Sequence, residues 1–315
     1  MPSLSRWGAG GARLLGKESN SIMKLYLKNT PVYDIDNNNL LDKQRAPGIL
    51  QKHPSNETFS NWLHSRYSSN TNAFARISLS REVLDKETHI FNLSDCYWIA
   101  DDNTISFENA SPYLNNHKDY TIPTFYTNGY LTKRWISSTQ LLKCGTNIEI
   151  EIECSRLTRL CHIPCAKVTH YAKNAIVIEN FTSKDIMFEA ADVSGRFNPD
   201  NFNEADILHL FHLKGFHMIL TDAIFGNGDR HAGNFGYLRD ANTGEYLSMA
   251  PLYDFDHALD AKGTTDNLLL DAINISKSNK QYKEEAIRIS TIIANNTSNE
   301  VFRKRASCIL KQLKE

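Results

Sequence analysis

The stretch Gly226-Asn-Gly-Asp-Arg-His-Ala-Gly-Asn-Phe-Gly236, followed by Pro251-Leu-Tyr-Asp-Phe-Asp256, contains the polar side chains that phosphoryl transfer requires. Asp229 offers a carboxylate that can orient and deprotonate an attacking hydroxyl. Asn234 and Asp254 offer oxygen ligands for the Mg²⁺ that neutralises a triphosphate. The step from Asp229 to Asn234 equals the Asp-to-Asn step of the protein-kinase catalytic loop. These residues predict an ATP-dependent kinase that uses Mg²⁺.

Asp, Asn and Gly are also the residues of ordinary turns, so a loop of this composition could serve structure alone. The order and spacing of the set argue against that interpretation. Two glycines, an Asp-x-His-x-x-Asn pattern and a following Tyr-Asp pair all occur in one run. We therefore interpret the run as a catalytic loop and a metal-binding loop.

The bulk composition is that of an ordinary globular protein. The chain has 315 residues, 41% of them hydrophobic, and a formal net charge of -1. This charge gives no electrostatic reason to expect nucleic acid or an anionic membrane as a partner. No apolar run approaches the ~20 residues of a membrane helix. We therefore expect no direct nucleic-acid contact and no membrane span.

The six cysteines are not spaced as a disulfide framework. Cys161 and Cys165 resemble half of a zinc site, but a second ligand pair is missing. Cys154 and Cys161 are expected to face the core from a helix. Residues 1–22 lack the apolar segment of a secretory signal. They are interpreted as a disordered leader, an upstream start or a cloning remnant, and the protein is expected in the cytoplasm, with delivery into a host cell left open.

The first 120 residues carry no motif to which chemistry can be assigned. The periodicity predicts strands at 23–28 and 31–34, a helix at 58–68, and extended or mixed structure at 74–84 and 95–107. We predict that residues 23–120 form an extension that packs on the rest of the chain, either as an addition to a lobe or as a surface for substrate docking.

A small β-rich lobe is predicted from residue 121. Residues 125–135 read as strand, turn and strand with Asn128 and Gly129 at the corner, a strong hairpin signal. A glycine at the tip of such a hairpin lets backbone N–H groups reach a triphosphate. Lys143 lies on the next strand, residues 140–145, where a kinase has the lysine that pairs with phosphates.

An acidic helix and a further strand follow. Residues 149–163 have helical spacing and an acidic start, which suits a helix N-terminus. The acidic residues are Glu149, Glu151 and Glu153. One of them is placed to pair with Lys143 and to position it for ATP. Residues 175–181 read as a strand that ends in a hinge, whose backbone would meet adenine.

The remainder is predicted to be mainly helical. Residues 204–225 show the wide apolar stripe of a core helix that leads into the catalytic loop. Residues 235–238 and 246–249 predict a hairpin. Two amphipathic helices are expected at 281–294 and 299–313, the second with a capping box formed by Thr297 and Glu300.

This order of elements resembles the HipA-like Ser/Thr kinases, and more closely their small stand-alone members of the cell-translocating kinase A type. The likeness covers about residues 120–315 well and 23–120 loosely. It implies an α+β, two-lobed protein-kinase-like fold with a small β-rich lobe and a larger, mainly helical lobe. The expected divisions are a leader at 1–22, an extension at 23–120, the small-lobe core at 121–182 and the helical lobe at 183–315.

The resemblance also implies roles for single residues. Asp229 is the catalytic base, Asn234 and Asp254 bind the metal, and Lys143 binds the ATP phosphates. Glu151 fits the glutamate of the helix because it lies twelve residues before Ile163, where the helix of that family ends; Glu149 and Glu153 remain alternatives. The other residues implied in ATP binding are Asn128, Gly129, Glu179, Asn180, Phe181 and His231.

The phosphate loop departs from the full-length toxins of that family. The loop at Thr127-Asn-Gly129 is short and lacks a Ser-Gly-rich segment, so their loop phosphorylation is not carried over. The chain is also shorter than those toxins, so an antitoxin partner is not implied. The expected partner is a protein substrate, with the chain itself as one candidate.

Two other functions remain open at this stage. The Gly228-Asp-Arg-His-x-x-Asn234 pattern followed by Asp-Phe also matches phosphatidylinositol kinases, so a lipid or other small alcohol is an alternative acceptor. A basic stripe or a membrane-binding helix that would support the lipid is missing. The second alternative is a pseudokinase that binds nucleotide without transfer.

Overall fold

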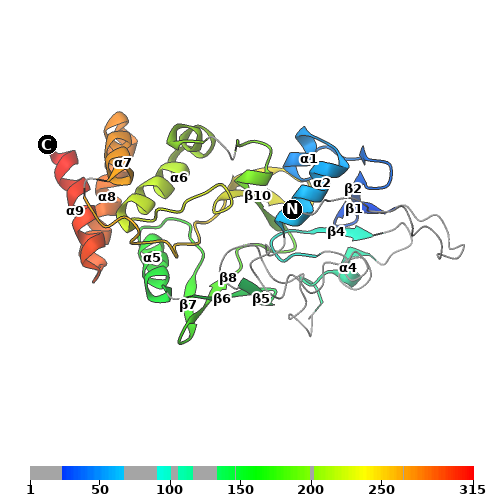
Figure 1. Ribbon diagram of the computed structural model, residues 1–315, viewed down its shortest axis with the longest axis horizontal. Coiled ribbons are helices and arrows are strands. Elements are labelled where there is room, and N and C mark those ends of the chain that lie inside the picture. Colours follow the sequence, from blue (N-terminus) through cyan, green and yellow to red (C-terminus); the bar gives the residue numbers. More distant parts are fainter. Residues whose placement is uncertain are drawn as a thin grey trace, which may run out of the picture.

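The computed structural model describes residues 23–66, 91–100, 106–115, 133–145, 147–198, 202–264 and 266–315. Figure 1 shows an elongated molecule with β1, β2 and β4 towards one end and the C-terminal helices at the other. Within these ranges, none of the helices has the length and apolar character that a bilayer crossing requires.

An antiparallel four-stranded sheet forms most of the N-terminal part. Its order is β3-β2-β1-β4, with β1 at Lys24–Leu27, β2 at Thr30–Asp34, β3 at Asn39–Leu40 and β4 at Tyr97–Ala100. The helices among the described residues of this part are α1 (Gly48–Lys52), α2 (Asn56–Ser65) and α4 (Phe107–Ala110). The strands and the helix predicted before residue 68 are confirmed, and the segment 74–84 lies outside the described residues.

A second antiparallel sheet carries Lys143. Its order is β5-β6-β8-β7, with β5 at Lys133–Ser137, β6 at Gln140–Cys144, β7 at Val168–Ala172 and β8 at Ala175–Glu179. Helix α5 (Ile148–Leu160) contributes Ile148 to a core shared with Ile176 and Ile178. The lysine strand, the acidic helix and the strand before the hinge are confirmed, whereas Asn128 and Gly129 lie outside the described residues.

A third sheet joins the N-terminal part to the rest of the molecule. Its order is β11-β10-β9, with β9 at Ile186–Ala190, β10 at Gly236–Asp240 and β11 at Tyr246–Met249. The hairpin of β10 and β11 is confirmed, whereas β9 was not predicted. Met187 of β9 is buried in the same apolar cluster as Leu25 and Trp98. The N-terminal part therefore shares a continuous core with this sheet.

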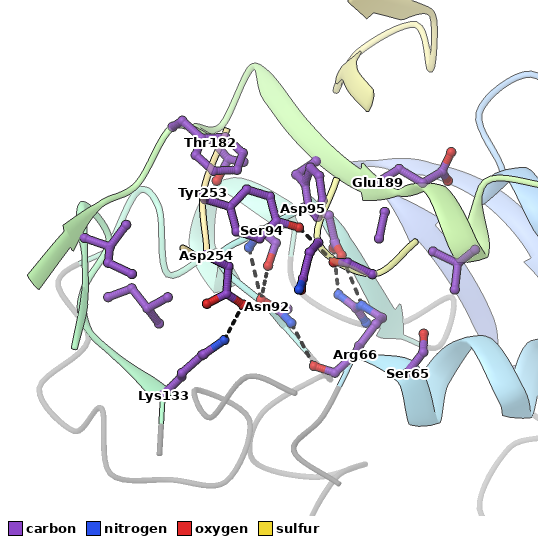
Figure 2. Close-up of a pocket in the computed structure, with 18 of the residues that line it drawn as sticks. Ser65, Arg66, Asn92, Ser94, Asp95, Lys133, Thr182, Glu189, Tyr253 and Asp254 are labelled. Atoms are coloured by element: carbon purple, nitrogen blue, oxygen red, sulfur yellow. Dashed lines mark hydrogen bonds and ion pairs between the residues drawn. The ribbon is translucent and has the colours of Figure 1, made fainter. Parts of the chain in front are cut away.

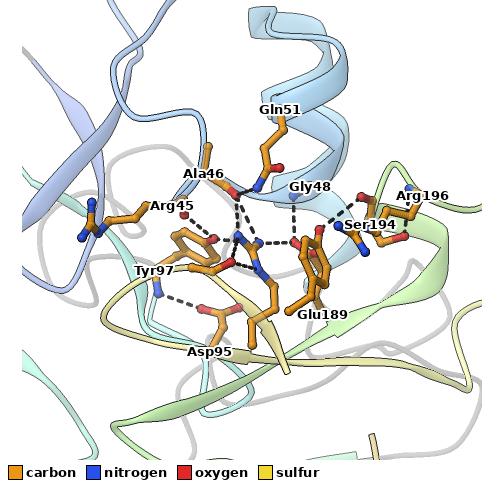
Figure 3. A network of polar contacts seen from close by, with 12 residues as sticks. Arg45, Ala46, Gly48, Gln51, Asp95, Tyr97, Glu189, Ser194 and Arg196 are labelled. Carbon is orange, nitrogen blue, oxygen red and sulfur yellow. Dashed lines mark hydrogen bonds and ion pairs between the residues drawn. The ribbon is translucent and has the colours of Figure 1, made fainter. Parts of the chain in front are cut away.

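A buried ion pair reinforces the same junction (Figure 3). Arg239 of β10 donates to the Glu189 carboxylate of β9 at 2.8 Å. Its guanidinium also donates to the backbone oxygens of Gln44 at 3.0 Å and Ala46 at 3.1 Å, and to the Tyr97 hydroxyl at 3.2 Å. Because the Arg239 side chain is 0% exposed, its bonds to Glu189, Ala46 and Tyr97 form away from water.

Helix α6 (Glu204–Phe225) leads into the candidate catalytic loop, but it is not one straight helix. Asn203 caps its start with a capping box. At His212 the φ angle is 49° and the helix kinks. Ile207 lies so close to Gly215 that a Cβ on Gly215 would be 2.8 Å from the Ile207 carbonyl oxygen. The continuous helix predicted over 204–225 is therefore wrong at His212.

Three helices close the other end of the molecule (Figure 1). They are α7 (Asn267–Ser278), α8 (Lys280–Asn296) and α9 (Glu300–Lys314). The two predicted helices, α8 and α9, are confirmed, whereas α7 was not predicted. The predicted cap by Thr297 and Glu300 is wrong, because Asn299 is the N-cap and its side chain accepts from the N–H groups at the start of α9. Cys154 and Cys161 are buried in the core, as expected.

Candidate active site

The candidate catalytic loop begins at a glycine whose position excludes any side chain. Gly226 ends α6 with a φ of 63°, and its N–H donates to the carbonyl oxygen of Asp222. A Cβ at this position would lie 1.9 Å from the carbonyl oxygen of Ala261. The chain therefore leaves the helix in one direction, which brings Asp229 to the wall of a cavity.

Asp229, the predicted catalytic base, has a half-exposed carboxylate. Its Oδ2 lies 3.6 Å from Nε2 of His257, and Nδ1 of His257 lies 2.8 Å from Oδ2 of Asp260. The hydrogen bond to Asp260, with help from the carboxylates of Asp256 and Asp229, raises the pKa of His257. This shift favours a positive charge beside Asp229. Sequence reasoning did not single out His257, although it directly follows the Asp-Phe-Asp run.

Arg230 connects the candidate catalytic loop to the candidate metal-binding loop, which carries Asp254. Its guanidinium makes two hydrogen bonds of 2.8 Å with the carboxylate of Asp222 in α6. It also donates to the backbone oxygens of Asn234 at 3.0 Å and Tyr253 at 2.8 Å. Because the side chain is only 7% exposed, these charge-assisted bonds fix both loops. Sequence reasoning missed this role. The only signal in the sequence was the position of Arg230 between Asp229 and His231.

The two predicted metal ligands line the same cavity. Asn234 donates from Nδ2 to the backbone oxygen of Asp229 at 3.2 Å, which fixes the orientation of its amide. Asp254 has a φ of 61°, a conformation that costs a non-glycine residue about 1 kcal/mol or more. Amide and carboxylate oxygens are ligands that suit Mg²⁺.

The described ranges hold no group of three or more His, Cys, Asp and Glu side chains arranged for a metal ion. A cation at Asn234 and Asp254 would therefore complete its shell with oxygens from phosphate and water, which is how Mg²⁺ is commonly held beside nucleotides. The side chains present fit such an ion.

Lys143 is the centre of a buried ionic cluster. Its Nζ lies 2.8 Å from Glu151, 2.5 Å from Asp254 and 3.1 Å from Asp256. Lys133 reaches the other carboxylate oxygen of Asp254 at 2.7 Å. Burial alone would lower the pKa of Lys143, but the three carboxylates outweigh it and the pKa is raised. The ammonium therefore keeps its charge inside the protein.

The structure pairs Lys143 with Glu151 among the three glutamates that the helix spacing left open. The Glu151 side chain is 2% exposed. Glu149 is 77% exposed, and Glu153 makes its ion pair with Arg156 instead. Sequence reasoning did not single out Lys133 or Asp256, although both lie next to motifs that it used.

A cavity of about 530 Å³ is lined by these loops, the sheet β5-β6-β8-β7 and the N-terminal part. This volume is in the range of small-molecule sites. Figure 2 shows Lys133 and Asp254 on one side and Arg66 and Ser65 on the opposite side. Arg66 and Asp95 form a buried pair through two bonds of 3.0 and 2.6 Å. The extension to which the sequence assigned no role thus supplies part of the cavity wall.

Two of the predicted hinge residues line the cavity but use their side chains elsewhere. The Glu179 carboxylate is 58% exposed and lies 3.0 Å from Lys167. Asn180 donates from Nδ2 to the backbone oxygens of Leu93 and Ser138, both at 3.0 Å. The bond to Leu93 joins the predicted hinge to the N-terminal part, and together these contacts leave little side-chain capacity for a ligand.

The third hinge residue, Phe181, belongs to an aromatic cluster in the cavity wall. Its ring centroid lies 5.8 Å from that of Tyr253, and Phe188 packs edge-on to both rings at 5.7 Å. Such a surface suits a flat ring system. His231 also lines the cavity, and its Nδ1 accepts from the N–H of Gly233 at 3.1 Å.

Comparison with known proteins begins with sequence. No family model matches the chain. A segment is similar to the serine/threonine-protein kinase CtkA of Helicobacter pylori, with 34% identity over 82 residues. The match covers 26% of this chain and 23% of that protein, so it spans about a quarter of the curated relative.

Comparison with solved structures covers more of the chain. HipA of Shewanella oneidensis MR-1, solved with HipB and operator DNA, superposes with a TM-score of 0.55 and 12% identity over 93% of this chain and 96% of HipA. The crystal structure of the Helicobacter pylori proinflammatory kinase CtkA gives a TM-score of 0.38 and 16% identity over 58% of this chain and 90% of CtkA. The overlay with HipA confirms the kinase-like fold that the family resemblance implied. The sequence match to the kinase CtkA supports a kinase-type function.

Proposed function

Because the chain has a HipA-like kinase fold, we propose that it is an ATP-dependent Ser/Thr protein kinase. The observation that carries the proposal is one cavity that brings Asp229, Asn234 and Asp254 together. The buried ammonium of Lys143 forms ion pairs with Asp254 and with Glu151. A base, two oxygen ligands and a fixed ammonium are the parts that phosphoryl transfer needs.

The proposed reaction uses positioning and electrostatics. The base of ATP lies near Phe181, and the triphosphate extends towards Lys143 and Asp254. The acceptor hydroxyl approaches Asp229, which takes up its proton. The acceptor oxygen then forms a bond to the γ-phosphorus while the bond between that phosphorus and ADP breaks. A covalent enzyme intermediate is not required.

Mg²⁺ held by Asn234 and Asp254 would neutralise charge on the phosphate oxygens. Burial alone would raise the pKa of Asp254, but the ammonium groups of Lys143 and Lys133 outweigh it and hold the pKa well below its usual value. The Asp254 carboxylate is therefore ionised, which cation binding requires, and a bound cation would compete with the two ammonium groups for its oxygens.

The proposed acceptor is a Ser or Thr hydroxyl of a protein, in keeping with the name of the relative CtkA. The chain itself is one candidate, at Thr127, Thr132, Ser137 or Ser138 near the phosphate loop. HipB and DNA are partners of HipA, and no such partner is proposed here. A phosphoinositide is the rival acceptor.

Transfer of label from γ-labelled ATP tests the proposal. Wild-type protein with Mg²⁺ should label a generic protein substrate or itself, and Asp229→Asn should lose at least about 10²-fold of that rate. Asp185→Asn is the control, because Asp185 is half-exposed and outside the cavity. Label on phosphoinositide vesicles instead of protein would favour the lipid kinase. Unchanged labelling by Asp229→Asn would remove the proposed base.

A further inference from the structure

One side chain beside the proposed base has no part in the reaction described above. His257 follows Asp256 in the candidate metal-binding loop, and its ring lies between two carboxylates. Nδ1 lies 2.8 Å from Oδ2 of Asp260, and Nε2 lies 3.6 Å from Oδ2 of Asp229. Asp229 and His257 both line the cavity. The imidazole therefore connects the base at the cavity wall to a second carboxylate of its own loop.

The carboxylate of Asp229 needs a partner that fixes its direction. Its backbone is held by Asn234, whose Nδ2 donates to the Asp229 carbonyl oxygen at 3.2 Å. Within the described ranges, the ion pair with His257 is the one polar contact of its carboxylate oxygens. The χ2 torsion of Asp is soft, so a carboxylate without a partner turns easily. A general base, however, must lie within hydrogen-bond reach of the proton that it removes.

The separation of 3.6 Å is longer than a hydrogen bond. Hydrogen bonds at catalytic sites are often this long without substrate and shorten when the reactive complex forms. The contact between His257 and Asp229 is therefore one that rotation of either side chain can close.

The segment that carries His257 is fixed against the start of the candidate catalytic loop. The Leu259 N–H donates to the Phe225 oxygen at 2.9 Å, and the Ala261 N–H donates to the Gly226 oxygen at 3.1 Å. Phe225 and Gly226 join α6 to the candidate catalytic loop. Because these bonds hold the two segments together, the imidazole can reach the base without a movement of the backbone.

The charge of His257 decides whether it can serve both neighbours. The charged groups that face its ring are Asp260 and Asp256 from its own loop and Asp229 from the candidate catalytic loop. The hydrogen bond to Asp260 is the largest cause of the raised pKa of His257, and the three carboxylates add to it. A protonated imidazole carries an N–H on each nitrogen, whereas the neutral ring has one donor and one acceptor. Only the protonated form can therefore donate to Asp260 and Asp229 at once.

We propose that protonated His257, held by Asp260, positions the carboxylate of Asp229 towards the acceptor hydroxyl. The inference rests on the proposed function, since Asp229 is the base of that reaction. His257 is a positioning residue, because it acts through Asp229 and takes up neither the proton nor the phosphoryl group. The proton still passes from the acceptor hydroxyl to Asp229, and the bonds that form and break are those of the reaction above.

The pH dependence of transfer from γ-labelled ATP tests the inference. The kcat of wild type should fall as the pH rises from about 6 to about 9, because His257 loses its proton above the usual His pKa of ~6.5. His257→Gln keeps a donor but no charge. Its kcat should be about 10-fold below that of wild type at about pH 6 and should not change across this range. Asp260→Asn should move the fall to lower pH, because it removes the carboxylate that raises the pKa of His257.

Two comparisons separate positioning of the base from other effects. His170→Gln is the matched control, because His170 is also half-exposed and lies 3.9 Å from a carboxylate, that of Glu149, outside the cavity. It should leave kcat and its pH dependence unchanged. In the Asp229→Asn background, His257→Gln should change the residual rate by less than about 2-fold, because the group through which it acts is already lost. A full 10-fold loss in that background would contradict positioning through Asp229.

Thermal unfolding shows whether a loss of rate comes from damage to the fold. His257 is half-exposed, so His257→Gln should melt close to the wild-type temperature. If it does not fold, the shift of the pH profile in Asp260→Asn is the test that remains. A wild-type kcat that does not fall with pH, or the same fall in His257→Gln, would overturn the inference, and loss of activity in Asp229→Asn would still support the kinase proposal. Absence of transfer by wild type to any acceptor would instead overturn the proposed function and this inference with it.

Discussion

At the scale of single residues, the surroundings of Lys143 determine its charge. Alone, a buried ammonium tends to lose its proton. Here three carboxylates lie within 3.1 Å of Nζ, and they keep it charged. Asp254 and Asp256 come from the metal-binding loop, whereas Glu151 comes from α5. In the proposed reaction, in which a cation engages Asp254, Glu151 would be the partner that holds the ammonium in place.

Glu151→Gln should reduce phosphoryl transfer by about 10²-fold while the fold is kept. Glutamine retains the size of the side chain but not its charge, so the ammonium shifts towards Asp254. The transfer rate from γ-labelled ATP measures the effect. Glu149→Gln is the matched control on the same helix, because its 77% exposed carboxylate should change the rate by less than about 2-fold. Equal losses in the two variants would contradict the pairing of Glu151 with Lys143.

The second prediction concerns acid stability. The pKa of Asp254 is held low in the folded protein, whereas a free Asp titrates near ~3.9. The ionic cluster therefore adds stability above that pH and loses it as the pH falls through the folded pKa. Lys133→Met removes one ammonium and raises the pKa of Asp254 in the folded state. Stability at pH 7 should fall by about 1–2 kcal/mol.

Circular dichroism between pH 7 and pH 2 measures this change. The acid-unfolding midpoint of Lys133→Met should lie at a higher pH than that of wild type. Lys167→Met removes a lysine from an exposed pair with Glu179 and should leave the midpoint unchanged. A midpoint shared by all three proteins would show that Lys133 does not stabilise the Asp254 carboxylate.

Local spacing predicts the polar residues of the candidate site but not their long-range partners. Asp229, Asn234 and Asp254 follow from one run of sequence, and the structure brings them to one cavity. Lys133 is 121 residues from Asp254, and nothing in its own neighbourhood marks that contact.

At the scale of elements, helix periodicity predicts which faces are buried but not where a helix turns. The apolar stripe of 204–225 continues across His212, so the pattern gives no sign of a break there. The signal is Gly215, where the absence of a side chain lets the chain approach Ile207 closely. The break requires a positive φ at His212, which costs a non-glycine residue about 1–3 kcal/mol.

His212→Gly should therefore stabilise the protein by about 1 kcal/mol, because glycine adopts a positive φ readily and the exposed His212 side chain loses little. His209→Gly provides the opposite control. His209 is an exposed residue of the same helix with helical geometry, and glycine there should cost about 1 kcal/mol. Urea unfolding of the two variants measures whether the free energy of unfolding rises or falls in each. Destabilisation by both would mean that residue 212 is helical in solution.

At the scale of the whole molecule, the N-terminal part is an integral component of the candidate kinase. Its apolar residues pack in one buried cluster with Met187 of β9. Arg66 and Asp95 line the cavity, and the backbone oxygen of Leu93 accepts a hydrogen bond from Asn180. Sequence reasoning expected an extension packed on the lobe but could not place it. The contacts depend on pairs separated by more than 80 residues, for which local patterns contain no information.

The Arg239 network makes this integration testable (Figure 3). Arg239→Met leaves Glu189 buried without its cation, and removal of one partner from a buried pair costs about 3–5 kcal/mol. Arg239→Met should also remove the hydrogen bonds to the backbone oxygens of Gln44 and Ala46. The loss of stability should therefore extend beyond β10. Lys304→Met, in an exposed pair with Glu300, should cost less than about 1 kcal/mol.

Hydrogen exchange locates where that stability is lost. If the N-terminal part and the third sheet form one cooperative unit, amides of β1, β2, β9 and β10 should exchange faster together in Arg239→Met, because the network contacts both sides of the junction. The cavity wall formed by Arg66 and Asp95 would loosen with them, and nucleotide binding should weaken although no residue of the catalytic loop has changed. Faster exchange confined to β9 and β10, with β1 and β2 unaffected, would show instead that the N-terminal part folds independently of the sheet on which it packs.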